Sequence, residues 1–121
     1  MVKNLPQAIK LARRYETIQL SEIQRAFIRY KGLWVVNYLT GLGNGPKPCP
    51  LCQAISNDCS LCIYGEHLAC THLNERAART YWACALADKP YKLLRAFRSR
   101  AKFLRWVIKQ QFPLLDGRKL K

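Results

Sequence analysis

The pattern of hydrophobic and polar positions predicts a chain built mainly from helices. It is clearest from Tyr91 to Gln110, where apolar residues recur at alternating steps of three and four, the spacing of one helix face. These residues are Leu94, Phe97, Ala101, Leu104 and Ile108. We therefore expect a long amphipathic helix there, ended by Pro113.

A shorter helix is expected near the N-terminus, over residues 6–16. Pro6 suits a first helical turn, because the missing N–H would have no partner there. Ile9, Leu11 and Ala12 face one side, and basic residues occupy other positions.

The next segment begins with a predicted capping box formed by Ser21 and Gln24. A buried face then follows at three- and four-residue steps, made of Ile23, Phe27, Tyr30 and Trp34. Gly32 interrupts this pattern, so we expect either one helix to about Leu39 or two helices with a turn at residues 30–32. The second alternative resembles a helix-turn-helix, but the apolar run at 33–36 favours core packing over a groove-reading face.

The composition of the middle of the chain predicts a loop followed by an irregular segment. Glycine and proline are too dense in residues 41–48 for a helix to continue. A further helix is expected from Asn74 to Asp88-Lys89-Pro90, with Ala77, Tyr81, Cys84 and Ala85 on one face. We thus predict a single small helical domain over residues 1–121. Its parts are N-terminal helices (1–40), an irregular zinc-knuckle module (49–73), C-terminal helices (74–110) and a basic tail (111–121).

Two Cys-x2-Cys pairs lie six residues apart in this irregular segment. Two such turns supply the four thiolates of a tetrahedral zinc site. We predict one structural zinc ion held by Cys49, Cys52, Cys59 and Cys62. Cys70 and His67 are alternate ligands, with Cys70 replacing Cys59 or Cys62.

Other chemistries are compatible with the same cysteines. An iron–sulfur cluster, two metals sharing a thiolate and a six-cysteine disulfide scaffold remain alternatives. Cys84 lies among alanine and leucine, which predicts a small buried apolar residue. The sequence shows no paired carboxylates, no phosphate-binding glycine loop and no Ser/His/Asp arrangement. We therefore expect no enzyme activity and no small-molecule substrate.

The formal net charge of +14 points to an acidic partner, and the charge is uneven. Residues 89–121 hold eleven basic and one acidic side chain, whereas residues 49–88 hold two basic and four acidic ones. A basic stripe follows the apolar stripe of the last helix. It is either a solvated face of a helix that packs through its other side or, as we predict, a polyanion-binding surface with Trp106 and Phe103 as stacking groups. The stripe consists of Arg95, Arg98, Lys102, Arg105 and Lys109.

Targeting signals are not apparent in the sequence. No apolar segment follows the N-terminal residues in the manner of a signal peptide, and no run reaches the ~18 apolar residues of a membrane span. We therefore expect a cytoplasmic protein without a membrane partner.

Several of these motifs, taken in order, resemble a group of small cysteine-rich phage and prophage proteins. The order is Trp34-x2-Asn37, a glycine-rich loop, Cys49-x-Leu51-Cys52, Asp58-Cys59-Ser60-Leu61-Cys62, Cys70-Thr71 and a basic C-terminal helix with Phe103-Leu104. The chain differs in having Ile63 where such proteins usually have proline, and Thr71-His72-Leu73 where they often have Thr-Pro-Tyr. The resemblance implies a phage setting, hence the cytoplasm of a host cell, and no catalytic residues.

These features together predict a zinc-stabilised basic protein that binds nucleic acid or a ribonucleoprotein complex. Charge supplies affinity with little sequence specificity. The alternative is a phage accessory or inhibitor protein whose basic helical surface docks on a host defence or transcription complex.

Overall fold

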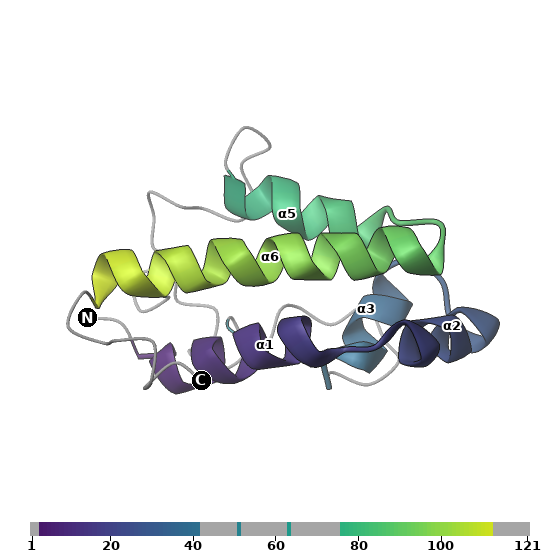
Figure 1. The fold of residues 1–121 in the computed structure, drawn as a ribbon, viewed down its shortest axis with the longest axis horizontal. Coiled ribbons are helices and arrows are strands. Elements are labelled where there is room, and N and C mark those ends of the chain that lie inside the picture. The colour runs from purple at the N-terminus through teal and green to yellow at the C-terminus, as the bar shows by residue number, and fades with distance from the viewer. Residues whose placement is uncertain (1–2, 42–50, 52–62, 64–75, 113–121) are drawn as a thin grey trace.

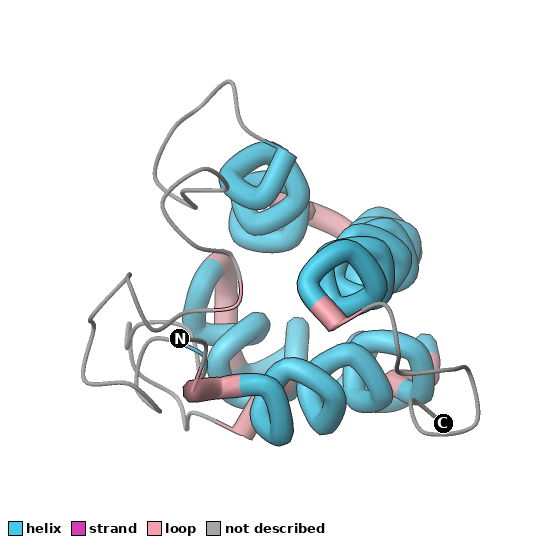
Figure 2. The backbone as a smooth tube through the Cα atoms, turned by 90° about the vertical axis from the view of Figure 1, so that its left-hand side faces the viewer, coloured by secondary structure: helices cyan, strands magenta, loops and turns pink. Residues whose placement is uncertain are grey.

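The computed structural model describes residues 3–41, 51, 63 and 76–112. Within them the chain forms helices joined by short loops, and no strand is present (Figure 2). The helices are α1 (Leu5–Thr17), α2 (Leu20–Arg29), α3 (Leu33–Leu39), α5 (Arg76–Ala85) and α6 (Pro90–Gln111). The prediction of a mainly helical chain is confirmed.

In the view of Figure 1, the longest helix, α6, lies between α5 and α1. It packs against α1, α2 and α5, while α3 packs against α2 and α5. α1 and α6 run side by side in opposite directions. The core is therefore built around one helix that contacts three others.

The buried face of α6 is wider than the periodicity predicted. Four of the five expected apolar residues are buried, whereas Leu94 is only partly covered. Further side chains join them in the core, namely Leu93, Ala96, Phe103 and Val107. The prediction that Phe103 stacks on bases is wrong, because its side chain is 0% exposed. A helix contacted from several sides needs a wider apolar face than a single stripe.

The N-terminal helix closely follows its predicted bounds. Ala8, Leu11, Ala12 and Tyr15 are buried along one side of α1, and Ile9 packs at the edge of the core. The Tyr15 ring stacks on Phe97 of α6, with 5.4 Å between the ring centroids.

The segment after it forms two helices, as the second alternative predicted. Gly32 joins α2 to α3 with φ +56°, a backbone conformation that side chains disfavour. The predicted cap is displaced. Glu22 accepts a hydrogen bond from the Gln19 N–H at 2.9 Å, so the helix begins at Leu20 instead of after Ser21.

The predicted buried position of Trp34 is wrong. Its side chain is 46% exposed, whereas Val35 and Val36 beside it are buried. The turn at Gly32 rotates α3 relative to α2, so the periodicity does not continue from one helix to the next. Trp34 and Tyr38 are four residues apart and thus share a face of α3.

The fourth described helix, α5, ends at Ala85, and Pro90 opens α6. The expected burial of Cys84 is confirmed, at 2% exposed. Of the predicted zinc-knuckle module, only Leu51 and Ile63 lie among the described residues, and both are fully buried. The predicted loop at 41–48 lies outside them except for Gly41, and so does the Asn74 cap. The tail predicted at 111–121 begins later than expected, because α6 continues to Gln111, and residues 113–121 lie outside the described residues.

Among the helices of the described residues, none combines the length and the apolar character that a membrane span requires.

Candidate nucleic-acid interface and cysteine module

The acidic side chains that the structure describes are all engaged by cations. Glu16 pairs with Arg105, Glu22 with Arg14, and Asp88 with Lys92. Cations greatly outnumber acids over the same residues. Most of the positive charge on this part of the surface is therefore left for counterions or an acidic partner.

Arg98, part of the predicted stripe, holds the end of α1. Its guanidinium donates hydrogen bonds to the Tyr15 carbonyl at 2.6 Å and the Ile18 carbonyl at 2.7 Å. The last carbonyls of a helix have no partner within the helix, and a cation there also offsets the helix dipole. Arg98 therefore joins α6 to α1 as a C-terminal cap.

Arg105 makes a second bridge between these helices. Its guanidinium donates hydrogen bonds to both carboxylate oxygens of Glu16, at 2.6 and 2.9 Å. The hydrogen bonds from Arg105 are the main reason that the pKa of Glu16 lies below its ordinary value. Two members of the predicted stripe thus have structural contacts.

The exposed members form a narrower stripe along α6. Arg95, Lys102, Trp106 and Lys109 follow at steps of seven, four and three residues, which places them on one face. Trp106 is 44% exposed and stacks on Phe103 with 6.1 Å between the ring centroids. None of the three cations pairs with an acid that the structure describes. We call these four residues the α6 stripe.

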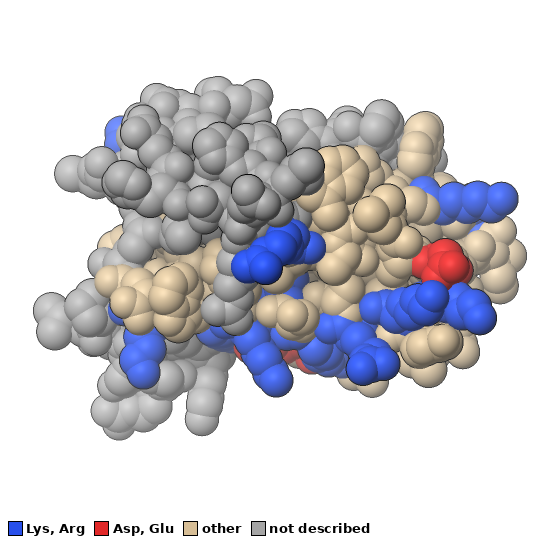
Figure 3. Space-filling model, turned by 90° about the horizontal axis from the view of Figure 1, so that it is seen from above, with Lys and Arg blue, Asp and Glu red and all other residues tan. Residues whose placement is uncertain are grey.

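The excess of cations over acids is also visible on the surface of the molecule. Seen from above Figure 1, the described part of the molecule shows Lys and Arg side chains with little acidic surface between them (Figure 3).

Arg100 is a cation that the sequence analysis did not single out. It is only 1% exposed and donates hydrogen bonds to Tyr15 Oη at 3.2 Å and Thr80 Oγ1 at 2.8 Å. Its guanidinium also lies over the Tyr81 ring, 5.5 Å from the centroid. The signal was present, because Arg100 stands three residues after Phe97 and four before Leu104, on the apolar face.

Cys84 has the properties of a core residue. Burial raises the pKa of its thiol to about 12, so the group is protonated at neutral pH. A protonated thiol is a poor metal ligand and a poor nucleophile. The expectation that Cys84 packs as a small apolar side chain is consistent with these surroundings.

The predicted zinc ligands fall outside the described residues. They are Cys49, Cys52, Cys59 and Cys62, with the alternates Cys70 and His67. Over the described part of the chain, no group of three or more His, Cys, Asp or Glu side chains is arranged to hold a metal.

Asn4 connects two points of the cysteine segment, residues 49–73, to the helical core. Its side-chain N–H₂ donates to the Leu51 carbonyl at 3.1 Å, and its side-chain oxygen accepts from the Ile63 N–H at 2.8 Å. All three residues are fully buried. Leu51 lies between the first two cysteines, and Ile63 directly follows Cys62. One amide therefore binds a backbone group next to each cysteine pair.

Comparisons with known proteins identify no relative of this chain. No protein-family model matches the chain. No curated protein matches it. No solved structure matches it either. The resemblance to phage proteins stays a prediction.

Proposed function

We propose that this chain is a zinc-stabilised, phage-type protein that binds nucleic acid, alone or in a ribonucleoprotein, through the α6 stripe. The main support is the α6 stripe itself, in which three exposed cations and a half-exposed tryptophan share one helix face. The stripe extends over about 21 Å at 1.5 Å per residue, long enough to contact several phosphates.

Its composition suits a sugar–phosphate backbone better than a single small anion. Lysine and arginine neutralise phosphates along a strand, and an exposed indole offers a surface on which any base can stack. Such contacts provide affinity without reading sequence. We therefore expect binding that depends strongly on salt and weakly on sequence.

A structural zinc ion completes the proposal. The thiolates of Cys49, Cys52, Cys59 and Cys62 would hold it, and the ion would stabilise a segment that the sequence predicts to be irregular. The Asn4 bridge supports a site that draws on both cysteine pairs, because Leu51 and Ile63 are each adjacent in sequence to a proposed ligand.

The experiment is a salt series on the zinc-loaded protein with a labelled oligonucleotide. The double variant Arg95→Ala with Lys102→Ala should bind all sequences more weakly. The slope of log affinity against log salt should fall by about 1.4 on single strands or about 1.8 on duplex DNA, because two phosphate contacts are lost. Arg98 is left unchanged since it caps α1.

A matched control removes the same charge elsewhere. Lys31→Ala with Lys89→Ala changes two exposed cations outside the α6 stripe, and the slope should change much less. No binding at low salt by the folded wild-type protein would reject the proposal. Capture of a host protein complex that survives nuclease treatment would then favour the alternative, a protein-docking function.

A further inference from the structure

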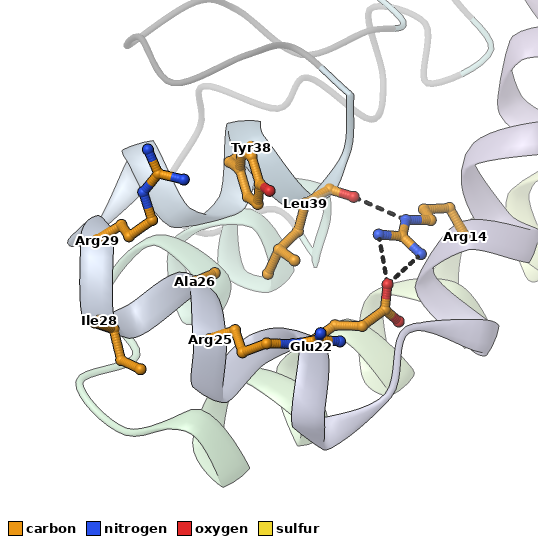
Figure 4. Close-up of a pocket in the computed structure, with 8 residues that line it drawn as sticks. All are labelled: Arg14, Glu22, Arg25, Ala26, Ile28, Arg29, Tyr38 and Leu39. Carbon is orange, nitrogen blue, oxygen red and sulfur yellow. Dashed lines mark hydrogen bonds and ion pairs between the residues drawn. The ribbon is translucent and has the colours of Figure 1, made fainter.

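Two adjoining hollows lie on the side of the molecule formed by α1, α2 and α3. One has a volume of about 700 Å³ and lies between α2 and α3, and the other, of about 470 Å³, lies between α1 and α3. Arg14, Tyr38 and Leu39 line both of them. Figure 4 shows the larger hollow, with the side chains of both helices around it. We call the pair the Tyr38 cleft.

The Tyr38 side chain lines both hollows. Tyr38 is 46% exposed, and its ring packs on Tyr30 with 4.9 Å between the centroids. The Arg29 guanidinium in turn lies 5.7 Å from the Tyr30 ring centroid. Tyr38 is thus supported from within the protein while part of its surface remains open. A supported, half-exposed ring is the kind of platform on which a base stacks.

Cations surround this ring. Lys10, Arg25 and Arg29 line the cleft with exposed side chains, and none pairs with an acid that the structure describes. The cleft also contains Glu22, whose charge is already taken. Its carboxylate accepts from the Gln19 N–H and from Arg14, and these contacts lower its pKa. The field in the cleft is therefore positive.

Arg14 lines both hollows and binds groups on two other helices. Its guanidinium donates to the Leu39 carbonyl at 2.8 Å as well as to Glu22 at 3.3 Å (Figure 4). These contacts join α1 to both α2 and α3. Hydrogen bonds between three helices therefore hold the walls of the cleft together before any ligand binds.

We propose that the Tyr38 cleft binds single-stranded nucleic acid, with one base stacked on Tyr38 and neighbouring phosphates contacted by Lys10, Arg25 and Arg29. A base must leave its duplex to reach the ring, so single strands are favoured over duplexes. The inference rests on the proposed function, and it assigns that function a second site besides the α6 stripe.

The test compares Tyr38→Leu with Tyr38→Phe on single-stranded DNA, single-stranded RNA and a duplex of the same length. Leucine keeps an apolar side chain but removes the ring, so single-strand affinity should fall about 5- to 160-fold with no change in salt slope. Phenylalanine keeps the ring and should bind within twofold of wild type. Duplex affinity should change little with either variant. The two single-strand arms show whether a 2′-hydroxyl contributes.

A matched control is Tyr91→Leu, which removes another half-exposed tyrosine that lies outside the cleft. It should leave single-strand affinity unchanged. Melting temperatures of all variants show whether each is folded. Equal affinities for Tyr38→Leu and wild type would overturn the inference. If the α6 double variant still weakened binding in that case, the proposed function would stand without this site, whereas a folded wild type that binds no oligonucleotide rejects both.

Discussion

Asn4 occupies the position before α1, where an asparagine would ordinarily cap the first helical turn. No hydrogen bond joins its side chain to that turn. The amide binds Leu51 and Ile63 instead, 47 and 59 residues further along the chain. A single residue thereby attaches the cysteine segment to the core at two points. Arg100 has a comparable role, because it joins Tyr15 to Thr80 within the core.

Replacing Asn4 with aspartate should test this role. The carboxylate still accepts from the Ile63 N–H but cannot donate to the Leu51 carbonyl, so two oxygens would face each other in a buried site. We expect a loss of about 1–3 kcal/mol in the free energy of unfolding. Zinc affinity, measured by competition with a chelator at pH 7, should fall as well.

Arg98→Met provides the control, because the Arg98 guanidinium binds the carbonyls of Tyr15 and Ile18 at the end of α1. It should lower stability by a similar amount without changing the zinc affinity of the folded protein. Equal zinc affinities for Asn4→Asp and wild type would contradict the role assigned to Asn4.

At the scale of elements, α6 combines three functions on three sides. One side supplies the core, a second joins α1 through Arg98 and Arg105, and the third presents the α6 stripe to solvent. Repulsion between cations on one helix is lowered where an acid or a helix end of a neighbouring element accepts them. Packing against α1 therefore makes a helix with this much positive charge compatible with a stable fold.

Arg98→Met is a direct test of the contact between α6 and α1. Methionine keeps an unbranched apolar stem but loses both hydrogen bonds to the end of α1. We expect a decrease of about 1–3 kcal/mol in stability, measured by urea unfolding, since bonds from a charged donor are lost. Arg95→Met, at an exposed position of the same helix, should change stability by less than about 0.5 kcal/mol. Similar losses for both variants would show that the cap contributes nothing.

At the scale of the whole molecule, 121 residues bury a modest core. Small domains have a small free energy of unfolding. A structural metal increases it, because the free energy of metal binding adds to the free energy of folding. The described core includes Leu51 and Ile63 from the cysteine segment, so the proposed zinc module and the helices share one apolar interior.

Removal of zinc should consequently affect the whole fold. The purified protein should contain about one zinc per chain, and chelation should lower its melting temperature and its helical circular dichroism signal. Cys49→Ser and Cys52→Ser should behave like chelated protein, whereas Cys84→Ala should keep its metal. A metal-free wild-type protein of unchanged stability would contradict the zinc proposal, and loss of zinc in Cys84→Ala would add that thiol to the ligands.

Local patterns determined much of this fold. Periodic apolar residues located α1 and α6 to within a residue or two. Gly32 marked one of the two alternatives, a turn between two helices, and this is the one that the structure has. These signals are reliable because helical spacing and backbone freedom depend on neighbours in the chain. The cysteine spacing likewise predicts a zinc module, which stays a prediction.

Only the tertiary structure decided what each cation does. Arg98, Arg100 and Lys102 lie within five residues on one helix, and their residue types do not distinguish them. Arg98 meets the carbonyls that end α1, Arg100 enters the core beside Tyr15, and Lys102 faces water. The role of Tyr38 likewise depends on distant residues, because its cleft lies where Arg14 of α1 binds Glu22 of α2 and Leu39 of α3. A side chain's role depends on groups brought to it from distant parts of the chain, and periodicity along one helix contains no information about them.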